Sequence, residues 1–144
     1  MRSLLDVNVL IALFDPDHVF HQRAHIWWAA NATDGWASCP ITESGFVRIM
    51  SQPTYSARVR FSPTELIERL AIFAQQTNHE FWADSISIRD SQLFARDRIH
   101  SSRQITDIYL LALAKTRNAR LTTFDEAVPL SAVLGALGQN LVTI

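Results

Sequence analysis

Four acidic residues stand out as side chains that could do chemistry together. They are Asp6, Glu43, Asp107 and Asp125. Each alone has an ordinary explanation, because an acidic side chain at or just after a helix N-terminus stabilises that helix. Four carboxylates in one cleft would instead repel one another unless protons or cations intervene, and hard oxygen ligands suit Mg²⁺ or Mn²⁺. Because a bound divalent ion lowers the pKa of water and neutralises phosphate charge, the four acids together favour metal-dependent phosphodiester hydrolysis.

The first of these acids lies in an almost wholly apolar N-terminal segment. An acid buried alone in such a segment would cost several kcal/mol, so it must lie at an edge, pair with another group or bind a metal. We expect a short buried strand at Ser3–Leu5 and a buried helix at Val9–Phe14, with Asn8 as the helix N-cap. Asp6 then lies at the carboxyl end of a strand, where open parallel sheets form ligand crevices.

Apolar spacing, turn residues and capping residues predict the other elements. The expected helices run from His21 to Asn31, from Pro40 to Met50, from Pro63 to Ala74, from Asp90 to Ala95 and from Thr106 to Arg117, with a short one near 124–126; the expected strands are 36–38, 81–82, 120–123 and 139–144. This alternation predicts an α/β fold with a central parallel sheet of about four or five strands flanked by helices. No repeat or linker divides the chain, so we expect one domain over residues 1–144.

Composition and charge limit the class of protein. With 144 residues, 48% of them hydrophobic, the chain can bury a core without disulfides. A net charge of -1 gives no general attraction to nucleic acid or membrane, so a polyanion would bind through local patches or a metal. The single cysteine, Cys39, excludes an intrachain disulfide, and no apolar run reaches the roughly 18 residues of a membrane span. We therefore expect a cytoplasmic protein.

The basic residues are almost all arginine, with twelve Arg and one Lys. Arg suits bidentate recognition of phosphate, although a genome rich in G and C gives the same bias. Arg96, Arg98 and Arg103 precede the apolar helix that carries Asp107. They are either solvated or candidates for contacting a phosphate backbone.

Other motifs point less clearly to chemistry. His18, His21 and His25 have a spacing that would permit metal ligation, but no neighbouring acid completes a site, so we expect them to form local hydrogen bonds or to face water. The four glycines form neither a dinucleotide-binding nor a P-loop pattern. Ser44 lacks the flanking glycine of a nucleophile elbow, because Glu43 precedes it.

The order and spacing of the acidic motifs resemble those of a known family over nearly the whole chain. The motifs are Leu5-Asp6-Val7-Asn8-Val9-Leu10, Thr42-Glu43, Ile105-Thr106-Asp107-Ile108-Tyr109-Leu110-Leu111-Ala112-Leu113-Ala114 and Leu121-Thr122-Thr123-Phe124-Asp125. They resemble the successive acidic motifs of PIN-domain ribonucleases and, more narrowly, of VapC toxins from VapBC toxin–antitoxin pairs.

The resemblance implies roles for individual residues. Asp6 and Asp107 match the acids most directly tied to Mg²⁺ or Mn²⁺, while Glu43 and Asp125 match those that ligate through water or complete the pocket. Asn8 and Thr106 match polar positions that orient these acids.

The resemblance also implies a function and partners. We expect a Mg²⁺- or Mn²⁺-dependent endoribonuclease, the toxin of a type II toxin–antitoxin system, in which a metal-activated water attacks the phosphodiester. Arg96, Arg98 and Arg103 are then candidates for contacting the RNA, and the expected partners are a second copy of the chain and a small VapB-like antitoxin whose tail covers the cleft. Two alternatives stay open: a non-catalytic module whose acidic pocket binds the basic tail of a partner, and a structure-specific DNA nuclease on the same fold.

Overall fold

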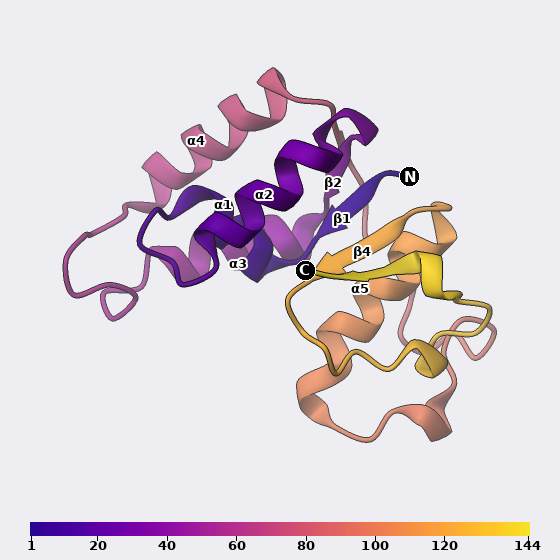
Figure 1. Cartoon of the computed structure of the whole chain (residues 1–144). Coiled ribbons are helices and arrows are strands. Elements are labelled where there is room, and N and C mark those ends of the chain that lie inside the picture. The colour runs from indigo at the N-terminus through magenta and orange to yellow at the C-terminus, as the bar shows by residue number, and fades with distance from the viewer.

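Five short parallel strands form the centre of the protein in the order β3-β2-β1-β4-β5 (Figure 1). The computed structural model describes residues 1–144. The strands are β1 (Ser3–Leu5), β2 (Trp36–Ser38), β3 (His79–Phe81), β4 (Arg120–Thr123) and β5 (Leu141–Thr143); the helices are α1 (Val7–Phe14), α2 (His21–Asn31), α3 (Pro40–Met50), α4 (Pro63–Gln76) and α5 (Ile105–Thr116). Short 3₁₀ helices lie at Ala32–Asp34, Arg96–Arg98, Ser102–Gln104, Leu130–Ala132 and Gly138–Asn140. Because every strand pair is parallel, all carboxyl ends lie along one edge, as the predicted α/β fold requires.

Helices cover both faces of the sheet, with α1 to α4 gathered on one side and α5 on the other (Figure 1). The central strand β1 shows why, because successive side chains of a strand point to opposite faces. Leu4 packs in the cluster that contains the apolar side of α5, whereas Leu5 packs with residues of α1, α3 and α4. The central strands β1, β2 and β4 are therefore buried on both faces, whereas the outer strands β3 and β5 are partly exposed. None of the helices is long and apolar enough to span a lipid bilayer.

The first helix begins two residues earlier than the sequence predicts. It spans Val7–Phe14, and its N-cap is Asp6, whose carboxylate accepts a hydrogen bond from the Val7 N–H at 2.7 Å. The prediction that Asn8 caps this helix was wrong, because Asp6 already supplies the acceptor at the helix N-terminus. Asn8 instead lies exposed in the first helical turn.

Two predicted short helices are single turns in the structure. At Asp90–Ala95, the Asp90 carboxylate accepts from the Gln92 N–H at 2.9 Å, and Phe94 then pairs with Val133 in an isolated bridge that ends the turn. At 124–126, the Asp125 carboxylate likewise accepts from a backbone N–H two residues on. Both acids thus close local turns in place of starting helices.

The remaining elements agree with the predictions to within a few residues, and the third strand lies slightly earlier than predicted, at His79–Phe81.

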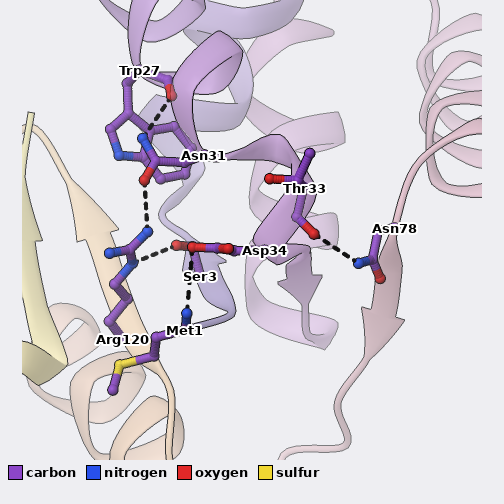
Figure 2. Close-up of polar contacts among 8 residues, drawn as sticks. All are labelled: Met1, Ser3, Trp27, Asn31, Thr33, Asp34, Asn78 and Arg120. Atoms are coloured by element: carbon purple, nitrogen blue, oxygen red, sulfur yellow. Dashed lines mark hydrogen bonds and ion pairs between the residues drawn. The ribbon is translucent and has the colours of Figure 1, made fainter.

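A polar network ties together the amino-terminal edge of the sheet (Figure 2). The Arg120 guanidinium donates to Ser3 Oγ and to Asn31 Oδ1, both at 2.9 Å. Beside it, the amino group of Met1 pairs with Asp34 at 3.4 Å. The network therefore joins the starts of β1 and β4 to the end of α2, away from the carboxyl edge that carries the acids.

Candidate active site

Asp6 lies where β1 ends and α1 begins, and it is only 7% exposed. Its two carboxylate oxygens accept from different groups: Oδ1 from the Val7 N–H at 2.7 Å and Oδ2 from the Thr123 hydroxyl at 2.8 Å. Burial raises the pKa of Asp6, and the hydrogen bonds from Thr123 and Val7 partly oppose that rise. A buried carboxylate held by neutral donors keeps its negative charge uncompensated.

Asp107 and Asp125 lie near Asp6 and interact with it electrostatically. Asp107 is half-buried in the first turn of α5, and its pKa is raised to about 7, first by burial and then by the negative charges of Asp6 and Asp125 and a hydrogen bond with Asp125. Asp125 is exposed just past β4, and its N–H donates to the Thr123 hydroxyl at 3.1 Å. Thr123 therefore links Asp6 to Asp125 through one side chain.

No basic side chain forms an ion pair with any of these three aspartates, which we call the aspartate cluster. Closely spaced carboxylates without counter-charges bind protons or cations, and Asp107 with its pKa near 7 shows the proton side of this tendency. The donor chemistry thus fits a hard divalent cation. As the side chains stand, however, no three His, Cys, Asp or Glu residues are close enough together to hold a metal ion. Cation binding would require the carboxylates of the cluster to move closer together.

The structure does not bring Glu43 into the aspartate cluster. Its Oε1 accepts from the Ser38 hydroxyl at 2.6 Å, and the same hydroxyl lies 2.7 Å from His79 Nε2. Because the Ser38 hydroxyl donates its only proton to Glu43, His79 Nε2–H must donate to Ser38. Burial lowers the pKa of His79, and the charge of Glu43 opposes this effect. The relay therefore fixes Glu43 from two neighbouring strands, β2 and β3.

Neither of the residues expected to orient the acids does so here. Asn8 and Thr106 are both exposed, and neither side chain makes a hydrogen bond within the protein. The groups that orient the acids are instead Thr123 for Asp6 and Ser38 for Glu43. Both are buried, and each is the last residue of its strand. Thr123 precedes the turn that carries Asp125, and Ser38 precedes the helix α3 that carries Glu43. That position in the sequence is the signal by which they could have been found.

The three candidate arginines are exposed in the segment that precedes α5. Arg96 donates to the carbonyl of Arg89 at 3.2 Å, and Arg98 pairs weakly with Asp97 at 3.9 Å. Arg103 makes no side-chain contact of this kind and lies one helical turn before Asp107. Of the three, Arg103 is thus the most available for a ligand at the aspartate cluster.

Of the two outcomes expected for the three histidines, the structure shows hydrogen bonds, of which those of His21 and His25 reach from α2 to α1. His21 Nδ1–H donates to the Ala12 carbonyl at 2.7 Å and His25 Nε2–H donates to the Leu13 carbonyl at 2.9 Å, so both satisfy the last turn of α1. His18 Nδ1 accepts from the Phe20 N–H at 3.0 Å. These contacts assign the histidines a structural role in joining α1 to α2.

This parallel sheet, with three aspartates at its carboxyl edge, defines a class of protein. The sequence model of the PIN-domain family matches residues 3–133 of the chain. The chain therefore belongs to the PIN-domain family, as its motifs predicted, and its relatives within that family are VapC ribonucleases.

Two relatives from Mycobacterium tuberculosis illustrate this similarity. Ribonuclease VapC44 is 49% identical over 144 residues, which is 100% of both chains. Ribonuclease VapC39 is 42% identical over 135 residues, which cover 94% of this chain and 96% of the relative. A solved structure, that of VapBC2 from Rickettsia felis bound to a DNA fragment from their promoter, has a TM-score of 0.58 at 12% identity and covers 100% of this chain and 98% of that one. At this identity the likeness concerns the fold.

Proposed function

We propose that this protein is a Mg²⁺- or Mn²⁺-dependent endoribonuclease and acts in the cytoplasm as the toxin of a type II toxin–antitoxin system. The observation that carries the proposal is the aspartate cluster: three interacting carboxylates at the carboxyl edge of the sheet, with no basic partner. The similarity of the chain to the VapC ribonucleases supports RNA as the substrate.

In this proposal Asp6 and Asp107 hold the cation, and Asp125 and Glu43 complete the site directly or through water. The cation, when bound, neutralises charge on the scissile phosphodiester and lowers the pKa of the attacking water. The chain's own groups prepare the site, because Thr123 and the Val7 N–H each orient one oxygen of Asp6. Asp107, whose pKa is raised to about 7, would lose its proton on cation binding, because a carboxylate ligand must be deprotonated.

The experiment that tests this function is cleavage of an RNA by the purified chain, with and without Mg²⁺. The variants Asp6→Asn and Asp107→Asn keep the shape of each side chain but remove its charge, and we expect each to reduce Mg²⁺-dependent cleavage by about two orders of magnitude or more. Asp34→Asn is the matched control, because Asp34 lies at the amino edge. Full activity of Asp6→Asn in a preparation free of contaminating nuclease would rule out the assignment.

A non-catalytic binding module is the second candidate, and two observations favour it. Glu43 is held by Ser38 and not by the aspartates, and no metal-binding group is complete as the side chains stand. Such a module would take up no Mn²⁺ in calorimetry of the isolated chain, whereas the nuclease should bind it specifically. Matched RNA and DNA strands in the cleavage assay distinguish a ribonuclease from a DNA nuclease.

We also propose two protein partners. The Rickettsia felis complex contains a VapBC pair, which supports a small antitoxin as one partner. A groove of about 690 Å³ between α3 and α4 is lined by Glu43 and by apolar side chains that include Val47, Ile67 and Leu70. An apolar segment of the antitoxin would lie in this groove, and its basic tail would reach the acids. The second partner is another copy of the chain, and light scattering with and without the antitoxin measures both assemblies.

A further inference from the structure

A small surface cluster has no role in the site described so far, and it is formed by the segment between α1 and α2, the first turn of α2 and the residue that follows β4. It consists of His18, Phe20, Arg23 and Phe124, and we call it the aromatic cradle. The Phe20 and Phe124 rings are 4.7 Å apart between centroids, and the His18 ring stacks on Phe124 at 6.4 Å with an interplanar angle of 20°. The Arg23 guanidinium carbon lies 5.0 Å from the Phe20 centroid and 5.8 Å from that of Phe124.

The Arg23 guanidinium lies over two aromatic rings and forms no ion pair with an acidic group. Its side chain is exposed and makes no hydrogen bond or ion pair with the rest of the chain. Two other arginines lie over aromatic rings, Arg69 over Phe14 and Arg117 over Trp82, but each contacts a single ring. A guanidinium stacked on aromatic faces keeps its N–H groups free at the edge of its plane, so it can still bind a phosphate with two hydrogen bonds.

The cradle also adjoins the aspartate cluster through the chain itself. Phe124 lies between Thr123, whose hydroxyl donates to Asp6, and Asp125. A substrate phosphate bound among three carboxylates needs positive charge beside them, and Arg23 is a free positive charge supported from this same turn. An RNA strand that enters the acidic site would therefore pass the cradle.

We propose that Arg23 binds a backbone phosphate of single-stranded RNA next to the phosphodiester that is cleaved, and that Phe20 and Phe124 hold its guanidinium in place. This inference rests on the proposed function and adds a substrate-binding residue to it. RNA is favoured over an acidic protein partner because the free charge lies beside a site that must accept phosphate.

The test compares Arg23→Gln with Arg117→Gln. Both variants remove one exposed positive charge that lies over an aromatic ring, but Arg117 follows the far end of α5 from Asp107. Binding of a short fluorescein-labelled single-stranded RNA is measured by anisotropy in Ca²⁺, and KM and kcat for its cleavage are measured in Mg²⁺. We expect Arg23→Gln to raise both Kd and KM about 10-fold, with kcat within about 3-fold of wild type, and to lower the salt dependence of binding by about one phosphate contact.

A second variant tests the cradle itself. Phe20→Leu keeps the Arg23 charge but removes one supporting ring, and we expect it to raise Kd about 3-fold. Thermal melting checks that each variant is folded. Arg117→Gln should bind the RNA like wild type.

Three results would overturn the inference. One is an Arg23→Gln protein that binds RNA with the Kd and salt dependence of wild type. Another is an equal loss in Arg117→Gln. The third is an Arg23→Gln protein that keeps RNA binding but loses binding of the antitoxin. If wild type cleaves RNA and the KM of Arg23→Gln is unchanged, only this inference fails, whereas a wild type that cleaves no RNA in Mg²⁺ overturns the proposed function.

Discussion

The two edges of the sheet differ in how their charged groups are arranged. At the amino edge, Arg120 donates to the neutral acceptors Ser3 and Asn31, and the amino group of Met1 pairs with the opposite charge of Asp34 (Figure 2). At the carboxyl edge, Asp6, Asp107 and Asp125 repel one another without a cationic partner.

This difference indicates what each edge is for. A satisfied network stabilises the fold, while unsatisfied charge costs stability and is retained where a ligand supplies the missing charge. Substitutions at the amino edge should therefore lower stability and leave activity intact, and substitutions at the carboxyl edge should lower activity with little loss of stability.

The largest expected change in stability follows from Arg120→Met. Methionine keeps most of the apolar stem but removes both donors, which leaves the oxygens of the buried Ser3 hydroxyl and of the Asn31 side chain without the Arg120 donors. We expect the free energy of unfolding to fall by about 1–3 kcal/mol, measured by urea denaturation. The Mg²⁺-dependent kcat of the folded protein should stay at the wild-type value. A large loss of kcat in a folded Arg120→Met protein would break the contrast between the edges.

Thr123→Val should show the opposite pattern. Valine has nearly the shape of threonine but removes the hydroxyl that donates to Asp6 and accepts from the Asp125 N–H. We expect metal affinity and cleavage to fall by about 10- to 100-fold, as for other residues that orient metal ligands. Thr123→Ser keeps the hydroxyl and should retain most of the activity. Equal losses in the two variants would show that packing and not the hydrogen bond matters at this position.

Local patterns were enough to predict the sheet and most helices. Apolar spacing and capping residues identified α2, α3 and α4 because these signals act over a few residues. The parallel arrangement then predicted that acids following different strands would meet at one edge, and the structure brings three of them near each other. The prediction of a short helix at Asp90–Ala95 was wrong, because an acidic residue such as Asp90 can either cap a helix or close a single turn.

Contacts between distant segments were the part that the sequence could not predict. The hydrogen bond from Ser38 to Glu43 is local, but His79 reaches Ser38 only because β2 and β3 lie side by side, and no local pattern indicates that contact. Likewise, Arg23 meets Phe124 only because α2 packs near the end of β4. The sequence suggested Arg96, Arg98 and Arg103 because they are close to Asp107 in the chain, whereas the position of Arg23 over Phe124 follows only from the folded structure.

A smaller effect is expected from Ser38→Ala. The substitution removes the hydroxyl that connects His79 to Glu43, so the Glu43 carboxylate loses its fixed orientation. We expect the Mg²⁺ concentration needed for half-maximal cleavage to rise by about 3- to 10-fold, with kcat at saturating Mg²⁺ nearly unchanged. Ser38→Thr, which restores a hydroxyl, should recover the wild-type requirement. An unchanged Mg²⁺ requirement in Ser38→Ala would show that Glu43 acts independently of this relay.

The smallest effect concerns the pH dependence of stability in metal-free protein. The pKa of Asp107 is raised to about 7, above its ordinary value, so the folded state binds an extra proton between the unfolded and folded pKa values. The contribution of Asp107 to stability should therefore fall as the pH rises from about 4 to about 7 and stay reduced above that range. Asp107→Asn removes this loss, and because the side chain is half-exposed we expect its Tm at pH 8 to exceed that of wild type by only about one to three degrees. At pH 4 the two proteins should melt together, and Asp34→Asn at the paired amino edge should instead lower Tm slightly at pH 8. A Tm difference between Asp107→Asn and wild type that is the same at pH 4 and at pH 8 in the absence of metal would mean that the carboxyl edge holds no such repulsion.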